Sequence, residues 1–486
     1  MSIFDSIRDV RDGKAVYKTF IDGQWIEASD TFVIMNPADG SVVAKVQKCG
    51  KDEAERAVSA AYNAKFKVAH MPAFERAEML ARMARLLDQN SMEIKEMICK
   101  ESGKTSDLAG GEVSSSIERL ELAADEARDI RGEIIKEDMV SNGKGMALVT
   151  RQPLGVILAI TPFNYPLFAA ISKIAPAIAA GNSVVIKPAS ADPVSLLMFG
   201  RIMQESKVPS GSINIVTGIG SELGNYLNSH IKIDMVSFTG SSDAGKRIAA
   251  VSGMKKLHLE LGGKASAIVL EDCSLNQAVS ECVTGSLKFY GQRCDAISRI
   301  LVVESVADKF VAGVLEEVKK WKLGDPGGAG VSIGPLINEK AASFVEELVN
   351  DAVKKGAKVL YGGKKQKLGY FEPTVLDNVT EDMDIAWKET FGPVITILRV
   401  KSYEDAMLVS NRSDYGLDAC IFTRDINKAI EAGENIEAGS VHINGHPKHG
   451  IGQFPFGGDK NSGIGRQGIK HSIDEMTKLH TIVLHL

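Results

Sequence analysis

Short apolar runs alternate with helical segments between Gly155 and Val251. The runs are apolar throughout, which is typical of a parallel sheet that helices cover on both faces. We predict strands at 156–160, 183–186, 213–216 and 235–238, and helices at 167–180, 193–206, 221–229 and 242–251. Nucleotides bind at the carboxyl ends of the strands in such sheets, so this part of the chain predicts a nucleotide site.

The N-terminal part predicts strands followed by helices. Residues 17–36 favour short strands, with a hairpin turn at Ile21-Asp-Gly-Gln-Trp25. Asp52 is expected to cap a first helix, and Met and Leu residues at helical spacing predict a long helix over 73–101. A third helix is expected over 112–129.

The remaining segments predict a second α/β unit and two further elements. Residues 265–444 repeat the pattern, with strands near Ile268, Ile300, Ile395, Ile421 and Val441. Residues 132–151 alternate around Asn142-Gly143, which is a strong hairpin signal. The chain ends in an apolar strand, 481–486, whose edge needs a partner strand or chain.

Length and composition narrow the function classes. A chain of 486 residues predicts two or three domains. The formal net charge of -5 gives no basic excess that points to nucleic acid or to an anionic membrane surface. The six cysteines are scattered without a Cys-x-x-Cys pair or a His cluster, which indicates a reducing compartment and no metal site. We find no secretory signal and no apolar run near the roughly 18 residues of a membrane span, so we expect a cytoplasmic protein.

One cysteine has the surroundings of a nucleophile. It ends the stretch Phe289-Tyr-Gly-Gln-Arg-Cys294. Gly291 lets the backbone approach a bound molecule, and Arg293 is expected to favour the thiolate of Cys294. A lone cysteine is more often a buried structural residue, so the other motifs must decide.

Polar residues follow three of the predicted strands. Asn164 lies in the rigid turn Thr161-Pro-Phe-Asn-Tyr-Pro166, where its amide can donate to an oxyanion or satisfy its own backbone. Lys187 and Ser190 follow the next strand, where a ribose or phosphate would lie. Gly240-Ser241 joins a strand directly to a helix, whose N-terminal N–H groups suit a pyrophosphate.

Two glutamates complete the set of candidate residues. Glu260 stands at an apolar strand end, and with a raised pKa it would make a general base. Glu389-Thr-Phe391 combines a carboxylate and an aromatic ring with a tight turn. In identity, order and spacing, the motifs resemble the aldehyde dehydrogenase superfamily over essentially the whole chain, through Asn164, Lys187, Gly240-Ser241, Glu260, Cys294, Glu389 and Phe391.

The resemblance implies an α/β aldehyde dehydrogenase-like fold with two doubly wound parallel-sheet domains. A Rossmann-like cofactor-binding domain would comprise residues 1–131 and 152–257, and a catalytic domain would comprise residues 258–450. Residues 132–151 and 471–486 would be oligomerisation elements that bury their strand edges in a homodimer or homotetramer.

It also implies the oxidation of a small aldehyde to its carboxylic acid. Cys294 would attack the aldehyde carbon, and the Asn164 amide and the Cys294 N–H would hold the oxyanion. After hydride transfer to a nicotinamide cofactor, Glu260 would activate the water that hydrolyses the thioester. The presence of Cys294 and Glu260 argues against an inactive structural member, and Glu260 argues against a CoA-acylating one.

The resemblance assigns a set of cofactor residues. They are Thr161, Pro162, Phe163, Lys187, Ser190, Gly220, Gly240, Ser241, Leu261, Glu389 and Phe391. Lys187 and Glu389 would bind the two riboses, and Phe391 would pack against the nicotinamide end. Members that prefer NAD commonly carry a glutamate where this chain has Ser190, whose small neutral side chain leaves room for a 2′-phosphate. We therefore expect NADP, with NAD possible.

The motifs look most similar to the non-phosphorylating NADP-dependent glyceraldehyde-3-phosphate dehydrogenase branch, especially its archaeal members. The expected substrate residues are Tyr165, Arg293, Lys448 and His449. Cations among them suit a phosphate on a short aldehyde. Some members carry arginines at the positions of Ser115 and His449, which this chain lacks, although Arg119 lies one helical turn beyond Ser115. Lactaldehyde, glyceraldehyde and succinate semialdehyde stay open as substrates.

Overall fold

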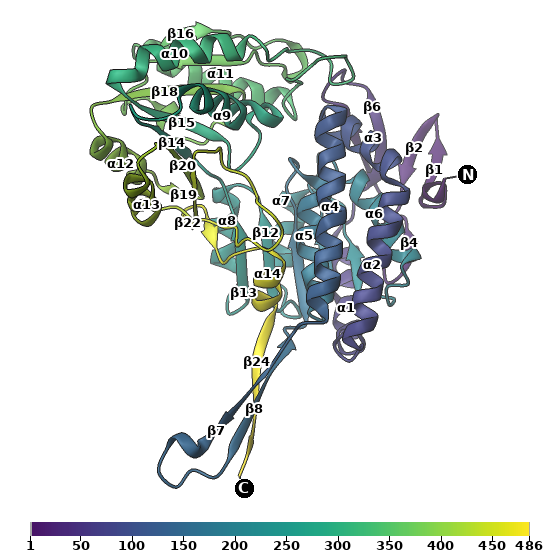
Figure 1. Cartoon of the computed structure of the whole chain (residues 1–486). Coiled ribbons are helices and arrows are strands. Elements are labelled where there is room, and N and C mark those ends of the chain that lie inside the picture. The colour runs from purple at the N-terminus through teal and green to yellow at the C-terminus, as the bar shows by residue number, and fades with distance from the viewer. Residues whose placement is uncertain (1, 486) are drawn as a thin grey trace.

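The computed structural model describes residues 2–485 and contains two large sheets (Figure 1). The first has eight strands in the order β23-β13-β12-β9-β10-β11-β3-β4. Its five central strands are parallel: β9 (Val156–Ile160), β10 (Ser183–Lys187), β11 (Ile213–Ile215), β12 (Met235–Thr239) and β13 (Lys256–Glu260). Antiparallel strands lie at its two ends: β23 (Gly463–Ile464), β3 (Thr19–Ile21) and β4 (Gln24–Ile26). The predicted parallel sheet and the hairpin at 21–25 are therefore confirmed.

Helices cover both faces of this sheet because successive strand residues point to opposite sides. Ile157 and Ala159 of β9 pack in one core, while Val156 and Leu158 pack in another. Figure 1 shows α2, α4 and α5 side by side on the first face. The helices of the two faces are α1 (Lys51–Ala69), α2 (Ala73–Gln89), α3 (Ser91–Ser102), α4 (Ser106–Ala127), α5 (Pro166–Ala179), α6 (Val194–Glu205), α7 (Gly220–Ser229) and α8 (Ser242–Val251).

The second sheet has seven strands in the order β16-β17-β18-β15-β14-β20-β21, and only β16 is antiparallel to its neighbour. The strands are β14 (Ala265–Val269), β15 (Ile297–Val303), β16 (Lys358–Tyr361), β17 (Thr374–Asp377), β18 (Val394–Val400), β20 (Asp418–Phe422) and β21 (Ser440–Ile443). The accompanying helices are α9 (Leu275–Leu287), α10 (Glu304–Val318), α11 (Glu339–Lys354), α12 (Tyr403–Asn411) and α13 (Ile426–Asn435). All five strands predicted between 265 and 444 are present.

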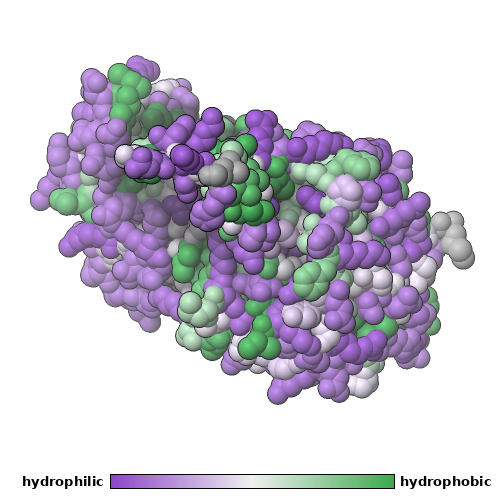
Figure 2. Space-filling view, turned by 90° about the horizontal axis from the view of Figure 1, so that it is seen from below, coloured by the Kyte–Doolittle hydropathy of each residue, from purple (hydrophilic) through white to green (hydrophobic). Residues whose placement is uncertain are grey.

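A three-stranded arm projects from the body of the molecule (Figure 1). It consists of β7 (Glu133–Lys136), β8 (Met146–Pro153) and β24 (Thr477–Leu484). The predicted hairpin is confirmed, and β24 begins at Thr477 rather than at 481 because it pairs with β8 over eight register positions. Figure 2 looks from the arm's end, and exposed apolar side chains of the arm include Ile134, Val140, Leu479, Ile482 and Val483.

Several smaller elements complete the chain. A four-stranded sheet contains β1 (Arg8–Arg11), β2 (Lys14–Tyr17), β5 (Thr31–Met35) and β6 (Val42–Gln47). A short pair, β19 (Tyr415–Gly416) and β22 (Asp459–Lys460), and the helix α14 (Ile469–Glu475) lie in the C-terminal part. No helix within residues 2–485 is long and apolar enough to cross a membrane.

Three helix predictions were wrong in part. The long helix expected over 73–101 is two helices, because Asn90 leaves helical geometry (φ -111°, ψ 14°) between α2 and α3. Asp52 does not cap α1, whose N-cap is Gly50. The helix α4 begins earlier than 112 because the Thr105 side chain accepts a hydrogen bond from the Leu108 N–H and starts it.

Candidate active site

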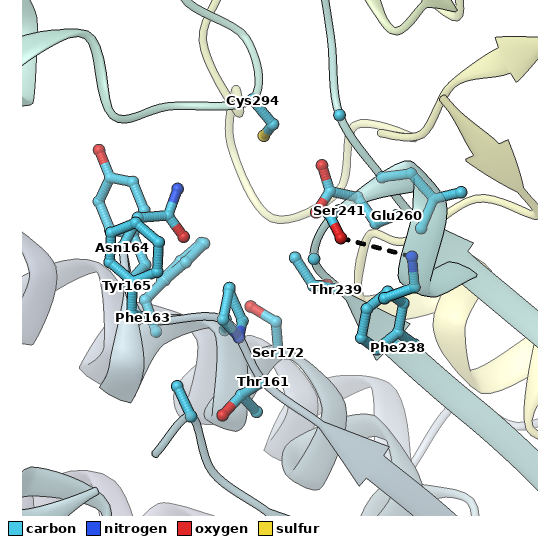
Figure 3. A pocket seen from close by; sticks show the side chains of 18 of the residues that line it. Thr161, Phe163, Asn164, Tyr165, Ser172, Phe238, Thr239, Ser241, Glu260 and Cys294 are labelled. Atoms are coloured by element: carbon cyan, nitrogen blue, oxygen red, sulfur yellow. Dashed lines mark hydrogen bonds between the residues drawn. The ribbon is translucent and has the colours of Figure 1, made fainter. Parts of the chain in front are cut away.

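A cavity of about 410 Å³ lies where β9, β12 and β13 end and the loop before β15 passes over them (Figure 3). Asn164, Glu260 and Cys294 line it from three separate segments of the chain. In Figure 3 the sulfur of Cys294 and the side chains of Asn164 and Glu260 face this common space. The predicted nucleophile Cys294, base Glu260 and oxyanion donor Asn164 therefore line the same cavity.

The loop that carries Cys294 has an unusual backbone. Phe289, Tyr290 and Gly291 have φ values of 47°, 60° and 73°, so three consecutive residues adopt the left-handed conformation. Left-handed non-glycine residues cost free energy and persist only where the surroundings hold them. The Tyr290 hydroxyl donates to the Gly103 carbonyl oxygen at 3.0 Å. A Cβ at Gly291 would collide with the Gly392 carbonyl oxygen, so only glycine fits there.

Electrostatics around Cys294 differ from the sequence expectation. Burial and the carboxylate of Glu260 raise the pKa of the Cys294 thiol well above its usual value. The Arg293 guanidinium turns to Asp295 instead, with 3.2 Å between Nε and Oδ1 and both side chains 4% exposed. The charge of Arg293 interacts with Cys294 as well as with Asp295, but burial outweighs it in the net shift of the thiol pKa. The expected effect of Arg293 on the thiolate stays a prediction.

Asn164 is held by the nucleophile loop itself. Its Nδ2 donates a hydrogen bond to the Gln292 carbonyl oxygen at 2.9 Å. A side-chain amide has two N–H donors, so one remains for an oxyanion in the cavity. The same contact ties the turn after β9 to the residues that precede Cys294.

Glu260 is a buried carboxylate with an unused acceptor. Its side chain is 1% exposed, and Oε1 has no hydrogen-bond partner among the described residues. Burial raises the pKa of Glu260, while His449 and Lys173 oppose that shift. The Lys173 Nζ donates to the Thr239 Oγ1 at 2.7 Å, and burial lowers the pKa of Lys173 to about 8. A carboxyl group whose pKa is raised in this way suits proton abstraction near neutral pH.

A second cavity, of about 600 Å³, adjoins the first and shares Tyr165, Phe168 and His449 with it. Its lining includes four cationic side chains, Arg119, Lys288, Arg293 and Lys448. Arg119 is buried, stands 5.3 Å from the centre of the Phe168 ring, and has no ion-pair or hydrogen-bond partner within residues 2–485. A buried cation without a counter-ion is expensive, so this side chain is suited to an anionic ligand.

His449 stands between the two cavities. Its ring stacks on Phe456 with 3.7 Å between centroids, and its Nδ1 lies 3.7 Å from an Asp295 carboxylate oxygen. The sequence did not show that His449 and Arg293 share Asp295 as a partner.

The other candidates extend from the first cavity toward α7 and α8. Ser241 caps α8, its Oγ accepting from the Ala244 N–H at 3.4 Å (Figure 3). Burial raises the pKa of Glu389 to about 7, and its Oε1 accepts from the Gly263 N–H at 3.0 Å. Phe391 meets Phe163 edge to face.

Lys187 and Ser190 lie near the N-terminus of α7. Burial lowers the pKa of Lys187 to about 8, and its Nζ donates to the Pro188 carbonyl oxygen. Ser190 donates to the Gly218 carbonyl oxygen at 2.8 Å. Gly220 begins α7, and a Cβ there would lie 4.0 Å from the Lys187 Nζ. Exposed N-terminal N–H groups of α7 and α8 are suited to bind phosphate groups.

Comparison with known proteins decides the family. Residues 25–482 match the model of the aldehyde dehydrogenase family. The chain belongs to the aldehyde dehydrogenase family. It is 40% identical to NADP-dependent glyceraldehyde-3-phosphate dehydrogenase of Pisum sativum, over 99% of this chain and 97% of that protein. It is 37% identical to lactaldehyde dehydrogenase of Methanococcus aeolicus, over 96% of this chain and 99% of that protein.

Solved structures agree. The crystal structure of NADP-dependent glyceraldehyde-3-phosphate dehydrogenase from Bacillus halodurans, complexed with NADP, superimposes on this aldehyde dehydrogenase with a TM-score of 0.95. It is 41% identical and covers 96% of this chain and 99% of its own. The predicted α/β aldehyde dehydrogenase fold and the predicted superfamily are confirmed.

The structure of this aldehyde dehydrogenase gathers most of the predicted residues. The first cavity is lined by Thr161, Pro162, Phe163, Asn164, Tyr165, Gly240, Ser241, Glu260, Leu261, Cys294, Glu389, Phe391 and His449. Arg293 and Lys448 line the second cavity, whereas Lys187, Ser190 and Gly220 line neither and lie toward α7. The roles assigned to these residues stay predictions. Among residues 2–485, no group of three or more His, Cys, Asp or Glu side chains is placed to hold a metal ion.

Sequence reasoning missed several lining residues of this aldehyde dehydrogenase. Thr239 stands at the carboxyl end of β12, a position that already marks ligand contacts in parallel sheets. Lys173 lines neither cavity but acts on the pKa of Glu260, and as the one charged residue of α5 it is itself a signal of a buried polar site. Gln467 and Phe168 carried no such signal, because only the tertiary fold brings them to the cavity.

Proposed function

We propose that the enzyme oxidises D-glyceraldehyde 3-phosphate to 3-phosphoglycerate with NADP. The observation that carries this proposal is the second cavity beside Cys294, which contains the unpaired cation of Arg119 together with Arg293 and Lys448. A phosphate on the far end of a short aldehyde would pair with Arg119 and Lys448, whereas Arg293 already has Asp295 as its partner. The relatives from Pisum sativum and Bacillus halodurans bear the name of this activity.

The chemistry assigned to the first cavity follows from the positions of three side chains. Cys294 gives its proton to solvent and attacks the aldehyde carbon as the thiolate, and the Asn164 Nδ2 and the Cys294 N–H donate to the resulting oxyanion. Bound NADP would supply the acceptor for the hydride that this carbon loses. Glu260 then takes a proton from a water that attacks the thioester carbon, and the sulfur leaves as the carboxylic acid departs.

The residues toward α7 and α8 fit NADP. The N-terminal N–H groups of both helices are available for phosphate oxygens. Ser190 presents a neutral hydroxyl where a carboxylate would repel a 2′-phosphate, and Lys187 adds a cation beside Gly220. Glu389 lies at the edge of the first cavity, where its carboxylate can accept from ribose hydroxyls.

The domain roles and the assembly belong to the same proposal. Residues 1–131 and 152–257 form the cofactor-binding domain, residues 258–450 form the catalytic domain, and the arm joins subunits. In support, the arm exposes Ile134, Leu479 and Ile482, which a dimer or tetramer would bury. A cytoplasmic location is supported by six free cysteines, which a reducing compartment preserves.

Lactaldehyde is the second candidate substrate. Ser115 stands where some phosphate-binding members carry an arginine, and Asp107 and Glu118 add acidic groups to the lining of the second cavity. An uncharged aldehyde tolerates such a mixed lining better than a dianion does. The relative from Methanococcus aeolicus bears the name of this activity.

Initial rates of NADPH formation distinguish glyceraldehyde 3-phosphate from lactaldehyde as the substrate. We would compare glyceraldehyde 3-phosphate, lactaldehyde, glyceraldehyde and succinate semialdehyde with the wild type and Arg119→Met. Loss of a charge-assisted hydrogen bond of about 1.5–3 kcal/mol predicts a fall in kcat/KM of about 10- to 100-fold, for the phosphorylated substrate alone. Arg128→Met is the matched control, because Arg128 follows the same helix and is largely exposed outside the cavity. Higher kcat/KM on lactaldehyde in the wild type would overturn the assignment.

A further inference from the structure

A buried ion pair lies against the turn that carries Asn164. Lys104, in the loop between α3 and α4, donates to Glu112 in the first turns of α4. Their side chains are 1% and 0% exposed. Replacing such a pair by apolar residues is often neutral or stabilising, so its presence calls for a role other than stability.

Glu112 fixes the turn that presents Asn164. Its Oε1 accepts hydrogen bonds from the Leu167 N–H at 3.0 Å and the Phe168 N–H at 3.1 Å. These are the second and third residues of α5, whose N-cap, Tyr165, offers no side-chain hydrogen bond. The first N–H groups of a helix have no partner within the helix, so Glu112 acts as a cap supplied by another helix.

Lys104 fixes the loop that presents Cys294. Its Nζ stands 3.9 Å from the centre of the Tyr165 ring and 4.4 Å from the centre of the Phe289 ring. The two rings meet edge to face, with 5.8 Å between centroids. Phe289 is the first of the three left-handed residues before Cys294. A desolvated cation is attracted to aromatic faces, so Lys104 helps to hold that strained backbone.

We propose that the Lys104–Glu112 pair is a positioning unit that sets the distance between the Asn164 amide and Cys294. One partner holds the turn of Asn164 and the other holds the loop of Cys294, and their mutual contact fixes the two relative to each other. The inference rests on the proposed roles of Asn164 and Cys294 in the reaction. Neither Lys104 nor Glu112 lines the first cavity, so both act on Asn164 and Cys294 through other residues. Glu112 also borders the second cavity, so the test includes a substrate that carries no phosphate.

Glu112→Gln tests the proposal against a closely matched control. Glu101 is also a buried glutamate that caps a helix, accepting from the Val194 N–H at 2.7 Å and the Ser195 N–H at 2.8 Å. It caps α6 and lines neither cavity. Misplacing reacting groups by about 1 Å costs about 100-fold, so we expect Glu112→Gln to lower kcat by about 10- to 100-fold at an unchanged KM for NADP. Glu101→Gln should change kcat less than about threefold.

The same comparison is made with p-nitrophenyl acetate, whose hydrolysis needs Cys294 and the oxyanion donors but no aldehyde and no cofactor. A wild type that hydrolyses the ester but does not oxidise glyceraldehyde 3-phosphate would refute the proposed function. The rates of ester hydrolysis in the variants would still test whether the Lys104–Glu112 pair positions Asn164 and Cys294. Equal losses of ester hydrolysis in Glu112→Gln and Glu101→Gln would overturn the inference, as would a wild type that fails to hydrolyse the ester.

A double variant covers the case in which Glu112→Gln does not fold. Lys104→Met with Glu112→Leu replaces the pair by apolar side chains of similar size and leaves no unpaired charge. We expect a folded protein whose thermal midpoint is lowered, because the Leu167 and Phe168 N–H groups lose their acceptor, and whose ester hydrolysis falls by about 10-fold or more. Wild-type ester hydrolysis in this variant would show that the pair does not set the geometry.

Discussion

Lys173→Met is expected to make the protein more stable at neutral pH. Lys173 is 1% exposed in α5, and burial lowers its pKa from 10.5 to about 8. The unfolded chain therefore binds more protons than the native protein between these two values. Below pH 8 both states carry the charge and the native state bears the full cost of burying it, and the cost disappears as the pH rises through that window.

The size of the effect follows from the shift. A difference between 10.5 and about 8 corresponds to about 3 kcal/mol of destabilisation at pH 7. The variant also loses the hydrogen bond from Lys173 to Thr239, which contributes about 1 kcal/mol. The net gain at pH 7 is about 2 kcal/mol, and above pH 10.5 the variant should be the less stable protein by about 1 kcal/mol.

Thermal unfolding of the cofactor-free protein measures the expected stability gain at pH 7 and the expected loss at pH 10.5. At about 2.1 cal/mol/K per residue, 486 residues give about 1 kcal/mol per degree, so the midpoint should rise by about 2 °C at pH 7. Thr239→Val is the control, because it removes the same hydrogen bond and keeps the charge, and its midpoint should fall at both pH values. A lower midpoint for Lys173→Met at pH 7 would refute the reasoning.

Three further variants test the site. Glu260→Gln should release one equivalent of NADPH and then turn over about 100- to 10,000-fold more slowly, because the thioester loses its general base; a steady state at the wild-type rate would exclude that role. Gly291→Ala should lower both the thermal midpoint and kcat, because its Cβ would collide with the Gly392 carbonyl oxygen at a φ of 73°; an unchanged kcat would show that the loop adapts. Ser190→Glu should raise the KM for NADP about 10-fold or more and leave that for NAD within about threefold, since a carboxylate there repels only a 2′-phosphate; a parallel change for both cofactors would contradict the assignment.

The periodic parts of the fold could be predicted from the sequence. Apolar strands such as 156–160 and 235–238 have one strongly favoured state, since both their faces must be buried. The break at Asn90 could not be predicted, because the Met and Leu spacing continues through it and only the packing of α2 and α3 decides.

In the candidate site, too, some residues could be predicted from local sequence and others depend on distant parts of the chain. Cys294, Glu260 and Asn164 stand next to turns and strand ends, so local sequence marked them. The direction of the Arg293 side chain depends on Asp295 and on a carbonyl more than 150 residues away, at Pro447, which local sequence does not encode. The Lys104–Glu112 pair was missed because the residues that it contacts belong to α5 and to the Cys294 loop, which lie far along the chain.

The proposed acyl-enzyme on Cys294 is the most direct test of the chemistry. Glu260→Gln would be mixed with glyceraldehyde 3-phosphate and NADP, quenched in acid after one turnover, digested, and analysed by mass spectrometry. The peptide that contains Cys294 should carry the mass of a 3-phosphoglyceryl thioester, in proportion to the NADPH released. NADPH formation with an unmodified Cys294, or an adduct on another of the six cysteines, would contradict the mechanism.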